Sequence, residues 1–173
     1  IKQQRADGSF YNYRTNVGSS NAKGAEVFGE LNITKALSRS AKNAGLSVFA
    51  SYCYNDGRYK NLKVVTVVNN ALSETNYRDN KVEYAPENIF RAGVTYSFRG
   101  LETTLQFSYT DQVFTDANNT EEPTANAQNG LVPSYSILDA TIGYKHKSGL
   151  SWKAGVNNLA NEHYFTRRAG GYP

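Results

Sequence analysis

The sequence of 173 residues lacks any long apolar run, and its mean hydropathy is −0.59. This excludes a membrane-spanning helix, which needs about 18 or more apolar residues in succession. A low mean hydropathy remains compatible with a membrane β-barrel, because only alternate residues of each strand face lipid and polar loops dilute the average. The single cysteine, Cys53, excludes an internal disulfide, and its strand-like surroundings predict an unreactive thiol.

Features of catalytic, metal and nucleic-acid sites are also scarce. The two histidines, His146 and His163, lie near no cysteine or carboxylate at metal-ligand spacing. The net charge is +4, but the longest basic run is the pair Arg167 and Arg168, so no nucleic-acid-binding patch is evident. Residues 116–122 have an oxygen spacing similar to a calcium loop, but Glu121 replaces the required glycine. We therefore expect no enzyme activity, no metal site, no cofactor and no nucleic-acid partner.

Aromatic residues are abundant: 13 tyrosines, eight phenylalanines and one tryptophan, of which tyrosine and tryptophan favour bilayer interfaces. Residues 88–113 show strict alternation of apolar and polar side chains on both sides of Arg99-Gly100. This predicts a β-hairpin with one apolar face, and each arm has about the ten residues that a membrane-crossing strand requires. A soluble sandwich would bury that face and a membrane barrel would expose it to lipid, so the hairpin fits both.

Further apolar stripes occur at 25–33, 46–54, 138–144 and 150–156, and a weaker strand at 10–17 precedes a turn at 18–21. The connections alternate in length: 38–45, 99–100 and 146–149 are short, whereas 57–87, 114–133 and the segment from 159 are long. We expect the second stripe to end at Asp56-Gly57 and the first long loop to contain only a short strand, 64–68. Outer-membrane barrels sort short and long connections in this order, and sandwiches have no reason to do so.

These patterns favour an all-β fold, an antiparallel up-and-down transmembrane β-barrel. Aromatic residues support this interpretation, because they lie beside the short turns (Tyr96, Phe98, Tyr144, Trp152) and beside the long loops (Phe90, Tyr109, Tyr135, Tyr164). A soluble β-sandwich is the alternative. An eight-stranded barrel that closes on itself is a further possibility.

Three segments resemble TonB-dependent outer-membrane receptors. Residues 155–173, GVNNLANEHYFTRRAGGYP, are similar to the family's N-L-F-(N/D)-x-x-Y segment before the final strand, with Ala160 in place of the usual aromatic. Residues 16–18 with 23–26 resemble N-V-G followed by G-V-E at a strand start, and 84–88, YAPEN, resembles the start of another barrel strand. The tail 164–173 is most similar to the ferric dicitrate receptor branch.

The resemblance implies that residues 1–173 are the C-terminal portion of a 22-stranded receptor barrel, about seven or eight of its strands, without the last strand. It also implies a plug domain and a TonB-contacting segment outside this chain. The first residues lack the apolar stretch of a signal peptide, so we expect an internal piece of a longer polypeptide. The expected partners are an iron chelate (a siderophore or ferric dicitrate), TonB through the plug, and lipid of a Gram-negative outer membrane.

A ferric chelate such as dicitrate is anionic, and arginine and lysine bind carboxylates by charge-assisted hydrogen bonds. The candidate ligand-binding residues are Arg78 and Lys81 in the first long loop, Arg91 on the polar side of its strand, and Arg167 with Arg168 in the last loop. The motif match concerns architecture and assigns no ligand role to them. Alternative functions are a carbohydrate-binding module with aromatic stacking platforms, and a structural barrel or adhesin.

Overall fold

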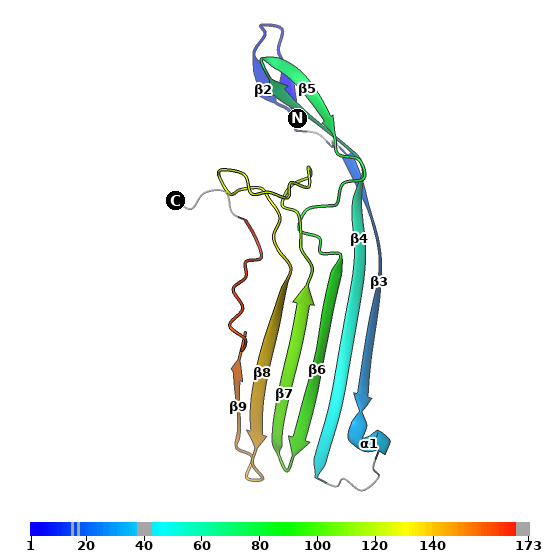
Figure 1. Ribbon diagram of the computed structural model, residues 1–173, viewed down its shortest axis with the longest axis vertical. Helices are drawn as coiled ribbons and strands as arrows, with labels where there is room; N and C mark the ends of the chain where they lie inside the picture. Colours follow the sequence, from blue (N-terminus) through cyan, green and yellow to red (C-terminus); the bar gives the residue numbers. More distant parts are fainter. Residues whose placement is uncertain (15, 17, 38–42, 169–173) are drawn as a thin grey trace.

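The computed structural model describes residues 1–14, 16, 18–37 and 43–168 (Figure 1). In chain order the elements are β1 (Lys2–Gln4), β2 (Phe10–Asn12), β3 (Gly18–Asn32), α1 (Ile33–Leu37), β4 (Ala44–Val68), β5 (Ala71–Asn76), β6 (Asn88–Phe98), β7 (Leu101–Thr110), β8 (Tyr135–Lys145) and β9 (Ser151–Val156). No helix in the described part of the chain is long and apolar enough to span a membrane.

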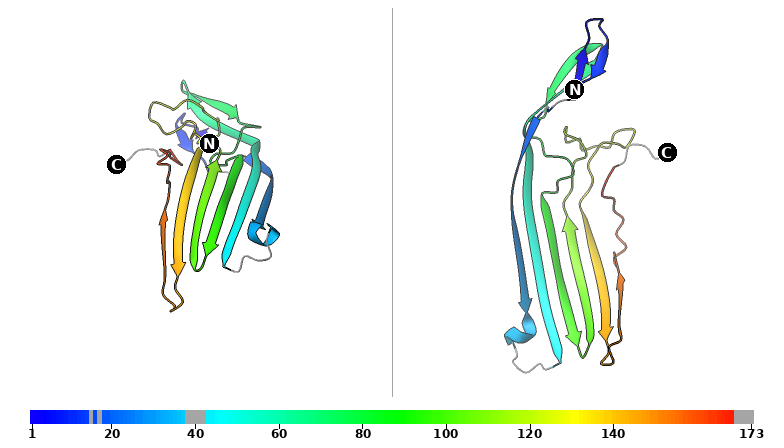
Figure 2. Two further views of the ribbon diagram at one scale, coloured as in Figure 1. Left: turned by 60° about the horizontal axis from the view of Figure 1, so that its bottom comes forward. Right: turned by 180° about the vertical axis from the view of Figure 1, so that it is seen from behind.

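A seven-stranded antiparallel sheet dominates the described residues, with the order β3-β4-β6-β7-β8-β9 and with β5 paired to β4. Consecutive strands of the path lie side by side, as the prediction of an up-and-down barrel requires. The sheet is a single open layer, with β3 and β9 at its two edges (Figure 2). The all-β antiparallel prediction is confirmed. The alternative fold, a soluble β-sandwich, is not observed, because no second sheet covers the apolar face in the described ranges.

The strand register gives the sheet one apolar and one polar face, since directly opposed residues of an antiparallel pair point to the same side. One apolar row runs across six strands: Leu31, Val48, Val94, Leu105, Ala140 and Val156. A polar row lies on the other face: Ser47, Thr95, Thr104 and Thr141, with the Thr95 and Thr104 hydroxyls 3.0 Å apart. Leu31 remains 55% exposed and Val156 54% exposed. A continuous exposed apolar face of this kind suits contact with lipid.

Aromatic side chains border the apolar face at both ends. Tyr144 lies opposite Trp152 at the end with the short turns, and Tyr52 lies opposite Phe90 at the other end. On β4, ten residue steps separate Tyr54 from Ala44. At about 3.3 Å per step and a tilt of roughly 40°, this distance spans about 25 Å of membrane thickness.

The β6–β7 hairpin confirms the prediction for 88–113, including its turn. Arg99 and Gly100 have φ angles of 48° and 92°. Positive φ at both central residues defines the type I′ turn, whose twist matches that of the flanking strands.

The prediction that the second stripe ends at Asp56-Gly57 was wrong, because β4 continues to Val68. The strand keeps a partner beyond Gly57: the Val82 amide donates to the Gly57 carbonyl at 3.0 Å. The chain reverses only at Asn69-Asn70, with φ angles of 50° and 60°, and returns as β5. Much of the expected loop 57–87 is therefore a hairpin that projects beyond β6, β7, β8 and β9 (Figure 1).

The N-terminal prediction also needs correction. The expected strand 10–17 is only the short β2, which pairs with β1, and the expected turn 18–21 is the start of β3. Gly18 permits this strand, because a Cβ there would lie 2.1 Å from the Asn61 carbonyl oxygen. In the β1–β2 turn, the Ser9 hydroxyl and amide donate to Asp7 and lower the pKa of its carboxyl.

The short connection predicted at 38–45 falls mostly outside the described residues. The structure adds a short helix before it, α1, which the sequence patterns did not indicate. The Asn32 side chain accepts a hydrogen bond from the Lys35 amide at 2.9 Å and caps this helix.

The two faces can be tested on β4 with fluorescent probes attached to single cysteines. Ala50→Cys and Ser51→Cys, each in a Cys53→Ala background, differ by one residue but point to opposite faces. In bilayers of the full-length protein, a lipid carrying a nitroxide on its acyl chain should quench the probe at 50 strongly and the probe at 51 weakly. Equal quenching would contradict the assignment of the apolar face to lipid.

Packing on the polar face predicts a steric effect at Gly93. A Cβ at Gly93 would lie 2.4 Å from Cε1 of Phe49, so Gly93→Ala should destabilise the barrel by about 1–3 kcal/mol in urea unfolding. Gly29→Ala is the control, since nothing lies within 4 Å of its Cβ. The added Cβ would also lie 3.0 Å from the Leu105 carbonyl oxygen, so Phe49→Leu should recover only part of the lost stability. No recovery at all would argue against the contact with Phe49.

Candidate ligand-binding loops and polar wall

The long connections before β6 and between β7 and β8 lie at the end of the sheet opposite the short turns, and the segment after β9 runs along β8 toward that end (Figure 1). They comprise the segment 77–87 before β6, the segment 111–134 between β7 and β8, and the segment 157–168 after β9. We call them loop A, loop B and loop C. The polar face of the sheet leads toward this end, so the three loops and the polar face together are the candidate site.

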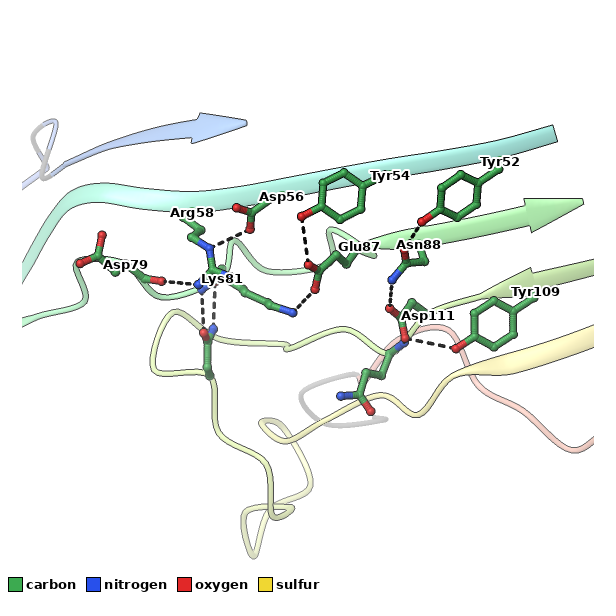
Figure 3. A network of polar contacts seen from close by, with 12 residues as sticks. Tyr52, Tyr54, Asp56, Arg58, Asp79, Lys81, Glu87, Asn88, Tyr109 and Asp111 are labelled. Carbon is green, nitrogen blue, oxygen red and sulfur yellow. Dashed lines mark hydrogen bonds and ion pairs between the residues drawn. The ribbon is translucent and has the colours of Figure 1, made fainter. Parts of the chain in front are cut away.

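A polar network lines the loop end of the apolar face (Figure 3). The Tyr52 hydroxyl donates to Asn88 at 2.6 Å, and the Asn88 amide donates to Asp111 at 2.8 Å. Tyr109 also donates to Asp111, at 3.3 Å. Because Tyr52 and Tyr109 belong to the apolar face, this network lies at the loop end of that face, which we call the outer rim. It does not lie on the polar face of the sheet, which we call the polar wall.

Two cations complete this rim network. Arg58 pairs with Asp56 at 2.7 Å and donates to the Asp79 carbonyl at 3.1 Å. Lys81 forms an ion pair with Glu87, whose other carboxylate oxygen accepts from Tyr54. The rim cations are thus engaged by carboxylates of their own chain.

Loop A is held against β4 by a tyrosine as well. The Tyr59 hydroxyl donates to the Glu83 carboxylate. Partial burial of Tyr59, with this hydrogen bond and the negative charge of Glu83, raises the pKa of Tyr59 to about 12. The hydroxyl therefore stays protonated and keeps donating at any physiological pH.

Loop B is folded upon itself. Val113 and Val132 form an antiparallel bridge, and both are buried. The Thr115 hydroxyl exchanges hydrogen bonds with the Gly130 backbone, at 2.9 and 3.0 Å. At 116–120, where the spacing resembles a calcium loop, both Asp116 carboxylate oxygens accept from Thr120. No group of three or more His, Cys, Asp or Glu that could hold a metal occurs among the described residues.

Loop C crosses toward the other two loops. Tyr164 stacks on Tyr135 of β8, with ring centroids 4.6 Å apart, on the polar side of the sheet. The Arg168 guanidinium donates twice to the Leu131 carbonyl of loop B, at 3.0 and 3.3 Å. The Tyr84 hydroxyl of loop A donates to the Arg168 carbonyl at 3.4 Å. All three loops therefore meet around Arg168.

The five predicted ligand-binding cations occupy different environments. Arg167 lies beside Arg168, with its guanidinium 5.9 Å from the Tyr84 ring centre. Arg78 is exposed, 3.8 Å from Asp79. Lys81 belongs to the outer rim. Arg91 is exposed on the polar face and makes no ion pair with any described residue.

Arg91 has hydroxyl-bearing neighbours on both sides. In the strand register Ser51 of β4 lies opposite it on one side and Ser108 of β7 on the other. A guanidinium flanked by two hydroxyl donors can bind an oxyanion through several hydrogen bonds. Sequence patterns placed Arg91 on the polar face, but not beside these serines.

The sheet and loops described above are shared with a known protein family. The model of the family described as TonB dependent receptor-like, beta-barrel matches residues 2–159. The chain belongs to this TonB-dependent receptor family. The resemblance derived from the sequence motifs is therefore confirmed. No match was found among curated protein sequences.

Two solved structures are similar to this TonB-dependent receptor chain in fold. One is the ferric citrate transporter FecA in its unliganded form, with 22% identity, a TM-score of 0.71 and 86% of this chain covered. The other is the siderophore receptor PiuA from Acinetobacter baumannii, with 22% identity, a TM-score of 0.64 and 98% covered. The chain spans 21% of the length of each. At this identity the likeness shows the fold, and the likeness to the ferric dicitrate branch stays a prediction.

The position of Arg168 predicts a structural effect that its neighbour should lack. Arg168→Lys keeps the charge but loses the planar group that donates twice to Leu131, so loop B should loosen. We expect faster amide exchange and proteolysis within 121–133 in this variant, and little change in Arg167→Lys. Equal effects of the two substitutions would contradict the conclusion that Arg168 holds loop B through the Leu131 carbonyl.

Proposed function

We propose that residues 1–173 form the C-terminal part of the barrel of a TonB-dependent receptor that imports an iron chelate across a Gram-negative outer membrane. The match of residues 2–159 to the receptor barrel family carries this proposal. The apolar face would contact outer-membrane lipid, and a plug outside this chain would relay energy from TonB. The protein would be a transporter and not an enzyme, because import makes and breaks no covalent bond.

The ligand class is argued from charge and from the neighbours in fold. Arg91 and Arg167 place positive charge on the polar wall and near the loops, where an anionic chelate would be attracted. The two similar structures are named as a ferric citrate transporter and a siderophore receptor. Both names indicate iron chelates, so we propose a siderophore or ferric citrate as the ligand.

The experiment is uptake of radioactive iron in cells grown under iron limitation. Deletion of the full-length receptor should abolish uptake of one class of chelate, and re-expression should restore uptake only in cells that contain TonB. Ferric citrate, catecholate and hydroxamate chelates should be compared. Unchanged uptake of all three classes after deletion would overturn the iron-chelate proposal.

A charge-assisted hydrogen bond contributes about 1.5–3 kcal/mol, so Arg91→Ala should weaken binding of the transported chelate roughly 10- to 100-fold. Arg91→Lys should weaken it less, because it keeps the charge. Lys147→Ala is the control, since this exposed lysine lies in the short turn between β8 and β9, at the end of the sheet opposite the three loops. Equilibrium binding to the purified full-length receptor measures the effect. Wild-type affinity in Arg91→Ala would exclude Arg91 from the site.

A further inference from the structure

Loops A and B are joined by the side chain of one asparagine. The Lys81 amide donates to Asn119 Oδ1 at 2.7 Å, and Asn119 Nδ2 donates to the Lys81 carbonyl at 2.9 Å. On its other side, Lys81 forms an antiparallel bridge with Arg58 of β4. The Asn119 amide group thus occupies the place where the next strand of the sheet would pair with Lys81.

The backbone around Asn119 is shaped to direct its side chain at loop A. Asn119 has a φ of 55°, a conformation that asparagine tolerates better than most residues. Its backbone amide donates to the Asp116 carbonyl at 3.1 Å, and its Nδ2 donates to the same carbonyl at 3.3 Å. The Asp116 carboxylate accepts from both the amide and the hydroxyl of Thr120. The turn is therefore fixed by contacts that do not involve loop A.

Two other contacts between the same loops flank this one. Asn80 Nδ2 donates to the Ala117 carbonyl at 2.7 Å, and the Tyr84 amide donates to the Phe114 carbonyl at 3.0 Å. Lys81 is also anchored through its own side chain, by the ion pair with Glu87. Asn119 is the residue that bonds both backbone groups of a single partner, so it sets the register between the loops.

We propose that Asn119 is a latch that makes loops A and B one mechanical unit. Movement of either loop away from the sheet then requires movement of the other, or rupture of the two Asn119 bonds together with the two contacts that flank them. This goes beyond the proposed transport function, because the latch acts in the free receptor and depends on no particular ligand. Its consequence for a receptor is that a molecule bound by one loop alters the position of both.

The test is hydrogen exchange of the full-length receptor in detergent or bilayers. Asn119→Gly removes the amide group but keeps the φ of 55° accessible. Loss of the two hydrogen bonds to Lys81, each of ordinary strength, should speed exchange of the Lys81 amide roughly 30-fold. Peptides from 78–84 and from 114–120 should both exchange faster, while peptides from β6 and β7 stay protected and show that the barrel is folded.

Two further variants separate the latch from general loosening. Asn118, at the adjacent exposed position, donates a side-chain hydrogen bond to Thr120 within loop B. Asn118→Gly should therefore leave exchange in loop A unchanged. Asn119→Asp keeps an acceptor for the Lys81 amide but loses the donor to its carbonyl, so its effect should be intermediate. Faster exchange in loop B alone, or unchanged exchange of Lys81 in Asn119→Gly, would overturn the proposal. An equal effect of Asn118→Gly on loop A would do the same.

Discussion

Backbone hydrogen bonding without water is the constraint on which the rest of this structure depends. Within a bilayer each strand amide and carbonyl needs a protein partner, and an antiparallel ladder supplies one across every strand pair. The ladder fixes which residues face the same side, and a slip of one residue would exchange the two faces. The two-residue turn at Arg99-Gly100 therefore determines more than a local reversal: it sets the register of β6 against β7.

The same ladder explains why neighbouring residues have such different roles. Arg91 and Ala92 are adjacent in sequence, yet one lies in a row with two serines and the other with Phe107. This separation of the two faces continues past the apolar face, at the loop end of the sheet. Lys81, in loop A, therefore joins Tyr54 and Glu87 on the outer rim, even though a loop lysine near a binding site suggests a ligand contact.

Alternation and turn chemistry predicted the β6–β7 hairpin because a sheet with one apolar and one polar face imposes a strict period of two. The same reasoning failed for β4 beyond Asp56, where the strand extends past the apolar face and alternation is no longer required. Gly57 was interpreted as an end, whereas Asn69-Asn70 formed the turn. The sequence showed which residues near the candidate site are cations. It did not show which groups these cations bind, because the partners lie far away in the chain: Arg168 binds the carbonyl of Leu131, 37 residues away.

The amount of positive charge that the loops retain depends on whether the groups bound by their cations are charged or neutral. Lys81 is neutralised by Glu87, but Arg168 donates to the Leu131 carbonyl, which carries no charge. The ion pairs found among the described residues include neither Arg167 nor Arg168. Arg168 can therefore hold loop B in place and still contribute, with Arg167, a positive potential beside Tyr84. Because the loops are already tied together, an anion drawn there would meet groups that need little further ordering, which reduces the entropic cost of binding.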